Sequence, residues 1–205
     1  GSGPGMTSTS VSGTVFNGPM TQATVTAYAI NNGMAGARIA SVATDSQGNF
    51  TMPLGSYAGP VMLQMSGGIY VDEATGSTVT MGAGDMMTAV MPTVADGTAV
   101  SGVWLTALTS MAQARASGMA GGMTEANIVA ANIAMGTYFS VGDILKTQPM
   151  NPMVAGSGTN ASHDARNYGM TLAAMSQYAR NLDMTVSSAM VTAMMGDAAD
   201  GVMDG

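Results

Sequence analysis

The chain contains no cysteine, and it has few charged residues. Without cysteine, disulfides, thiolate catalysis and cysteine-based zinc or iron–sulfur sites are all excluded. Only 8% of the 205 residues are charged, against roughly 25% in an ordinary soluble domain. Low charge together with abundant glycine, serine, threonine and alanine is more typical of a surface or secreted protein than of a cytosolic enzyme.

Positive charge is especially scarce. The formal net charge is −7, and the five basic residues are scattered along the chain as Arg38, Arg115, Lys146, Arg166 and Arg180. Residues spaced in this way do not make a phosphate-binding patch, so we expect no nucleic-acid partner. No apolar run approaches the roughly 20 residues that a membrane helix needs, and the first residues lack the pattern of a signal peptide.

Both ends of the chain are rich in glycine. Residues 1–9 are expected to be a flexible segment. Gly1–Gly5 is either an expression-vector remnant or the spacer that follows the lipid-bearing cysteine of a bacterial lipoprotein, and the second interpretation implies a lipid anchor upstream of Gly1. Residues 201–205 carry no evident stop signal for a finished domain, as expected of a piece of a longer protein.

Residues 10–93 have the period-two alternation of β-strands. About seven short runs, each bounded by Gly, Pro, Asn or Asp, favour an antiparallel β-sandwich. The clearest turn is the segment 45–49, where Asp45 is placed to accept hydrogen bonds from backbone amides and Gly48 supplies a left-handed φ. Because short alternating runs flank this turn, we predict a β-hairpin over Ser41–Leu54.

Two motifs give this half of the chain a family resemblance. The first is Val11-Ser12-Gly13-Thr14-Val15 with Gly18-Pro19 and Ala23-Thr24-Val25-Thr26-Ala27-Tyr28, and the second is Ala43-Thr44-Asp45-Ser46-Gln47-Gly48-Asn49-Phe50. Together they resemble the carboxypeptidase regulatory-like, prealbumin-like (transthyretin-like) sandwich of bacterial surface proteins and lipoproteins, except that Gln22 stands where that family usually has Gly. The resemblance implies a binding, spacer or adhesion module without catalytic residues.

After Pro92 the apolar spacing becomes helical. Residues 99–104 are either a last strand or an entry segment. Helices are predicted over 105–116, from the N-cap Thr124 to about 139, from a cap at Asn160 or Ser162 to about 182, and from Thr185 to about Met195. Residues 94–205 are therefore predicted to form an α-helical domain of about four helices, and the whole chain an α+β protein in two parts.

Methionine is unusually frequent, with 23 residues against seven leucines. The interpretation we favour is that Met takes the place of Leu in the core, as at Met111, Met135 and Met175. Thioethers also suit Cu(I), and four pairs have spacings that allow two sulfurs to converge: Met62/Met65, Met119/Met123, Met150/Met153 and Met190/Met194. Met150/Met153 is the best candidate because it lies in a proline-rich loop, but His163 is the only imidazole available as a further ligand.

Other groups that carry chemistry are sparse. The carboxylates of Asp197–Asp204 lack the spacing of an EF-hand loop. Asp72, Glu73 and Asp85 would bind calcium only if their loops met. Ser157 lies in a Gly-Ser-Gly loop rather than a nucleophile elbow. The glycine-rich segment 118–122 is followed by no lysine that would reach a phosphate.

From these observations we expect no enzyme, no cofactor and no metal site. The predicted function is a non-catalytic structural or interaction module of a bacterial cell-surface or secreted protein, with an adhesion, spacer or assembly role and a protein partner or self-association. One alternative is a self-assembling filament subunit that associates through exposed strand edges. The other is a methionine-rich, Cu(I)-binding periplasmic or surface protein.

Overall fold

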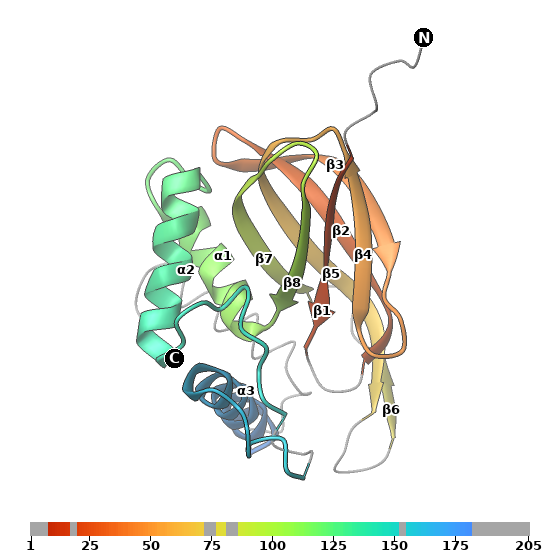
Figure 1. Ribbon diagram of the computed structural model, residues 1–205, viewed down its shortest axis with the longest axis vertical. Coiled ribbons are helices and arrows are strands. Elements are labelled where there is room, and N and C mark those ends of the chain that lie inside the picture. Colours follow the sequence, from red (N-terminus) through yellow and green to blue (C-terminus); the bar gives the residue numbers. More distant parts are fainter. Residues whose placement is uncertain (1–7, 17–19, 72–76, 81–85, 152–154, 182–205) are drawn as a thin grey trace.

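The computed structural model describes residues 8–16, 20–71, 77–80, 86–151 and 155–181. Within these ranges the chain is mostly β, with eight strands and three helices (Figure 1). In chain order they are β1 (Thr9–Val15), β2 (Met20–Asn31), β3 (Met34–Ala43), β4 (Asn49–Gly55), β5 (Gly59–Val71), β6 (Thr78–Thr80), β7 (Met86–Val94), β8 (Ala99–Leu105), α1 (Ala107–Gly118), α2 (Glu125–Phe139) and α3 (His163–Asn181). None of these helices is long and apolar enough to span a membrane.

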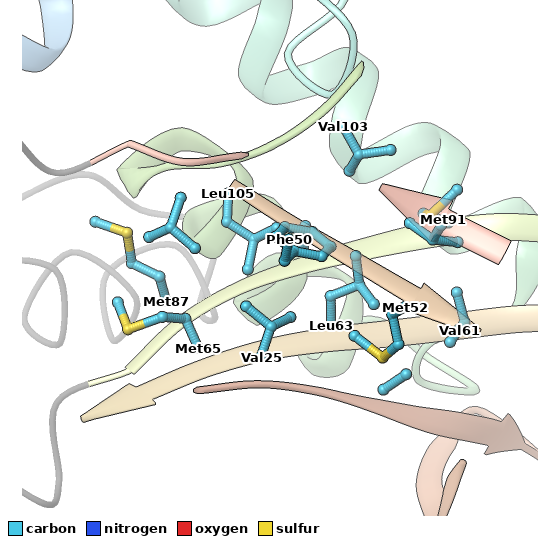
Figure 2. Close-up of a cluster of buried hydrophobic side chains, with 14 of the residues drawn as sticks. Val25, Phe50, Met52, Val61, Leu63, Met65, Met87, Met91, Val103 and Leu105 are labelled. Atoms are coloured by element: carbon cyan, nitrogen blue, oxygen red, sulfur yellow. The ribbon is translucent and has the colours of Figure 1, made fainter. Parts of the chain in front are cut away.

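The strands form two sheets that share one apolar core. The smaller sheet has the order β4-β1-β8, in which β1 and β8 run parallel. The larger has the order β3-β2-β5-β6, and β7 also pairs with β5. Side chains from both sheets fill the space between them, and Figure 2 shows Phe50 and Leu105 together with Val25 and Leu63 from the opposite sheet.

Strand β5 is longer than the alternation predicts. The sequence suggests a turn at Gly67–Gly68, but β5 continues through both glycines. Its first part, up to Ser66, pairs with β7, and its last part, from Ile69, pairs with β6. The two glycines, whose φ values are 66° and 108°, therefore lie at the point where β5 changes partner on one edge.

The segment 41–54 is a connection between the two sheets, so the predicted hairpin is wrong. Strand β3 pairs with β2, whereas β4 pairs with β1. The turn itself forms as its chemistry predicts: Asp45 Oδ1 accepts from the backbone N–H groups of Gln47 (2.8 Å) and Asn49 (2.9 Å). Gly48 has a φ of +80°, and a Cβ there would lie 2.6 Å from the carbonyl oxygen of Val15.

Removal of the Asp45 carboxylate is expected to destabilise this turn in a pH-dependent way. The hydrogen bonds from the backbone N–H groups of Asn49 and Gln47 hold the pKa of Asp45 below its ordinary value of 3.8. A lowered pKa means that the stabilisation is complete above about pH 4 and is lost as the pH falls through the folded-state pKa. In urea titrations, the midpoint difference between wild type and Asp45→Ala should therefore shrink below that pH. A difference that is independent of pH would contradict this account.

The predicted α+β organisation in two parts, with about four helices in the second, is wrong. Strand β8 lies beyond the expected start of the helical part and yet belongs to the three-stranded sheet, beside β1. Helices α1 and α2 pack on the outer face of the five-stranded sheet, where Ile30, Met62 and Val90 meet Ile128 and other apolar residues of the helical segment. The helices thus form a third layer over a sheet. The fourth predicted helix lies outside the described residues.

The three described helices begin close to where the sequence predicts. Thr124 caps α2, and Ser162 Oγ accepts from the N–H of Ala165 at the start of α3.

Met111 and Met135 are buried, and Met175 packs against the same apolar cluster. Four further methionines lie in the core between the sheets: Met52, Met65, Met87 and Met91 (Figure 2). Methionine therefore serves as a core residue, as expected.

The helical layer is attached to the sheet at a contact between backbones. Gly33, in the turn between β2 and β3, accepts a hydrogen bond from the N–H of Met123 over 2.8 Å. A Cβ at Gly33 would lie 1.8 Å from the carbonyl oxygen of Gly121, and one at Gly122 would lie 2.5 Å from that of Gly33. The glycine-rich segment 118–122 therefore serves to bring the connection between α1 and α2 against the sheet.

Candidate functional site

Helix α1 covers the open edge of the five-stranded sheet with hydroxyl groups. Strand β7 pairs with β5 along one side, which leaves backbone groups of Thr88 directed away from the sheet. The N–H of Thr88 donates to Ser110 Oγ over 3.0 Å, and its carbonyl oxygen accepts from Thr109 Oγ1 over 2.8 Å. All three residues are buried. Side chains of a helix thus take the place of a further strand, which protects the edge from pairing with another chain.

The same hydroxyl groups hold the start of α1. Thr106 Oγ1 accepts from the N–H groups of Leu108 (3.2 Å) and Thr109 (3.3 Å), and Thr109 Oγ1 accepts from the N–H of Thr106 (2.8 Å). This is a capping box in which Thr109 stands where Glu or Gln is usual. We call Thr88, Thr106, Thr109 and Ser110 the hydroxyl cluster.

Tyr168 extends the hydroxyl cluster to helix α3. Its hydroxyl donates to the carbonyl oxygen of Ile144 over 2.7 Å and lies 2.7 Å from Thr106 Oγ1. Because a tyrosine has a single hydroxyl proton, the second bond is donated by Thr106. Tyr168 is fully buried, and this burial raises the pKa of its hydroxyl well above the usual range. The phenol therefore stays neutral and joins α1, α3 and the segment around Ile144.

The edges formed by β8, β4 and β3 are also modified. The outer edge of β8 is covered by the segment 143–147: the N–H of Trp104 donates to the carbonyl oxygen of Leu145 over 2.9 Å, and Lys146 Nζ donates to the carbonyl oxygen of Ser101. Strand β4 contains Pro53, which has no N–H to donate. Strand β3 carries two register shifts against β2, and both place the extra residue on β3. Proline and bulges of this kind discourage pairing with another chain.

The residues that the sequence singles out for chemistry do not form a site in the described part of the chain. His163 is exposed at the first position of α3. Ser157 Oγ donates to the carbonyl oxygen of Asn151 and so closes a loop. No group of three or more His, Cys, Asp or Glu residues that could hold a metal ion occurs among the described residues. The remaining acidic candidates lie outside these residues: Asp72, Glu73, Asp85 and the cluster Asp197–Asp204.

The methionine pairs proposed for Cu(I) differ in where the structure places their side chains. Met62 faces the helical layer and Met65 faces the core between the sheets, so their sulfurs point away from each other. Met119 and Met123 belong to the same apolar cluster, which includes Ile128 and Ala131 of α2. Met150 is half-buried and its N–H donates to the carbonyl oxygen of Ala165 over 2.9 Å. Met153 and the pair Met190/Met194 lie outside the described residues.

One surface feature was missed at the sequence level. Helix α2 has its expected buried side, with Ile128, Ala131 and Met135, but its opposite side is apolar too. Val129 and Ile133 are exposed there. The signal was present in the sequence, since Glu125 is the only charged residue of α2. A solvated helix face is ordinarily rich in charge, so this face is a candidate contact surface.

Comparison with known proteins adds no relative to this picture. No family model matches the chain, and no curated protein is significantly similar to it. The prealbumin-like resemblance of residues 11–50 therefore remains a prediction, and the function has to be inferred from the residues themselves.

Proposed function

We propose that this chain is a non-catalytic structural and interaction module of a bacterial cell-surface or secreted protein, with an adhesion role. The observation that carries the proposal is the use of the buried polar side chains. Thr88, Thr106, Thr109 and Ser110 bond backbone groups and one another, and Tyr168 joins them. Polar groups in a catalytic site are instead directed at a space where a substrate binds.

The low charge and the modified sheet edges support the same role. A protein displayed at high density must avoid random pairing through its strands, and the edges of β4, β7 and β8 and the bulged β3 meet this need. At these four strands the features speak against the filament alternative, because polymerisation through sheet edges requires a regular free strand. We therefore do not advance the filament.

Surface display tests the proposal. Bacterial cells carrying the chain on an N-terminal lipid anchor should attach to each other, or to an abiotic surface, several-fold more than cells carrying the anchor alone. His163→Ala is the matched control for chemistry and should leave attachment unchanged. Attachment equal to that of the bare anchor would refute the proposal, as would its loss in a folded His163→Ala variant.

A further inference from the structure

The most apolar exposed helix face in the described part of the molecule is the outer side of α2. Its members recur at the spacing of one helix face, namely Ala126, Val129, Ala130, Ile133 and Thr137. Ile133 is 58% exposed and Val129 is 43% exposed. Figure 1 shows α2 on the flank of the molecule, with the five-stranded sheet on its other side. Large apolar side chains in such a row are a recognised sign of a protein contact.

We propose that this face binds the same face of a second copy of the chain, with the two α2 helices antiparallel. The inference rests on the proposed function, because it supplies the contact through which displayed modules would hold each other. The chain has a net charge of −7, so two copies repel each other over most of their surfaces. Between Ala126 and Phe139 α2 carries no charged residue, and here two copies meet without that repulsion.

Charge also selects the antiparallel arrangement. In a parallel pair the two Glu125 carboxylates and the two helix N-termini would lie side by side. In an antiparallel pair each N-terminus lies beside the partner's C-terminus, where the helix dipoles attract each other. The small residues Ala126 and Ala130 then leave room for Val129 and Ile133 of the other copy, as in ridges-into-grooves packing.

The size of the face predicts a weak dimer. A helix of 15 residues is about 22 Å long, and one pair of such helices buries less than the ~1,200 Å² of a standard stable interface. The dimer should therefore form at high micromolar to millimolar concentration and be monomeric in dilute solution. Anchoring on a surface provides effective concentrations in the mM range, at which a contact of this strength becomes populated.

Sedimentation equilibrium of the purified full chain, from dilute to millimolar concentration, tests the dimer. The average mass should rise from that of one chain toward that of two. Ile133→Lys should weaken association about tenfold or more, because the contact would then bury a lysine from each of the two chains, close to each other. Met170→Lys is the matched control: Met170 lies on α3 and is 56% exposed, and the charge change is the same. Circular dichroism and the melting temperature report whether each variant is folded.

Cysteine cross-linking locates the contact. Since the chain has no cysteine, Ala130→Cys provides a single thiol. With an added thiol oxidant such as diamide, which takes up the two electrons and two protons, it should form a disulfide-linked dimer, whereas Ala174→Cys on the exposed side of α3 should not. A monomer at millimolar concentration, or equal association of Ile133→Lys and Met170→Lys, would overturn the proposal. So would a thiol at 130 that reagents cannot reach, because the chain's own residues 182–205 would then cover the face.

The two proposals fail separately. If the displayed chain promotes attachment but the soluble chain stays monomeric, the module role stands and the self-contact is wrong. If the soluble chain dimerises through α2 but displayed cells do not attach, the contact stands and the adhesion role is wrong.

Discussion

Gly33→Ala is expected to destabilise the protein by roughly 2–4 kcal/mol, because it combines backbone strain with a steric clash. Asn32 and Gly33 both have positive φ, at 52° and 76°, as in the tight turns of hairpins. An alanine at position 33 would be strained at this positive φ, and the strain lowers the free energy of unfolding. Its Cβ would also lie 1.8 Å from the carbonyl oxygen of Gly121, so the connection between α1 and α2 would have to move away from the sheet.

Gly102→Ala is the matched control for this prediction. Gly102 has a φ of +70°, and a Cβ there meets nothing within 4 Å. It should therefore cost only the strain, about 1 kcal/mol. Urea unfolding of both variants gives the comparison, and the difference between them measures the contact that holds the helical layer. Equal losses would mean that the helices are not held to the sheet at this turn.

The local structure of this chain could be predicted because its causes are local. Asp45 and Gly48 make a turn wherever that segment lies, and Thr124 caps a helix through atoms within three residues. Alternation similarly indicates that Val25 and Phe50 belong to strands with one buried face. It does not tell which strand lies beside which. For this reason the alternation predicts a hairpin over Ser41–Leu54, although its two strands belong to different sheets.

The hydroxyl cluster could not be predicted because its causes are not local. Thr88 in a strand and Thr109 in a helix are ordinary residues for solvated faces, and their alignment depends on α1 crossing the open edge of β7. The same non-local packing makes β8 a neighbour of β1. Because α1 packs on that edge, the apolar sides of the helices are buried within the same domain as the sheets. A separate helical bundle is not needed to bury them.

Tyr168→Ala should have the largest effect among single side-chain truncations, a loss of about 3–5 kcal/mol, since it removes a fully buried aromatic ring and leaves a cavity between α1 and α3. Tyr168→Phe keeps the ring and removes only the hydroxyl. The carbonyl oxygen of Ile144 and the hydroxyl of Thr106 then lose their partner in a buried place, at a cost of about 1–3 kcal/mol. Tyr138→Ala, at 63% exposure, is the control and should change stability little.

The pH dependence of unfolding distinguishes the contribution of the Tyr168 hydroxyl to stability from that of its ring. Burial raises the pKa of Tyr168 in the folded state, whereas in the unfolded chain it titrates near 10. A raised pKa means that the stabilisation is complete below about pH 10 and is lost as the pH rises further, because only the unfolded state then gains by ionising. Wild type should therefore lose stability more steeply than Tyr168→Phe between about pH 10 and 11, as measured by urea midpoints. Parallel curves for the two proteins would contradict the burial of a neutral phenol, and with it the assignment of Tyr168 as the residue that fixes α3 to the hydroxyl cluster.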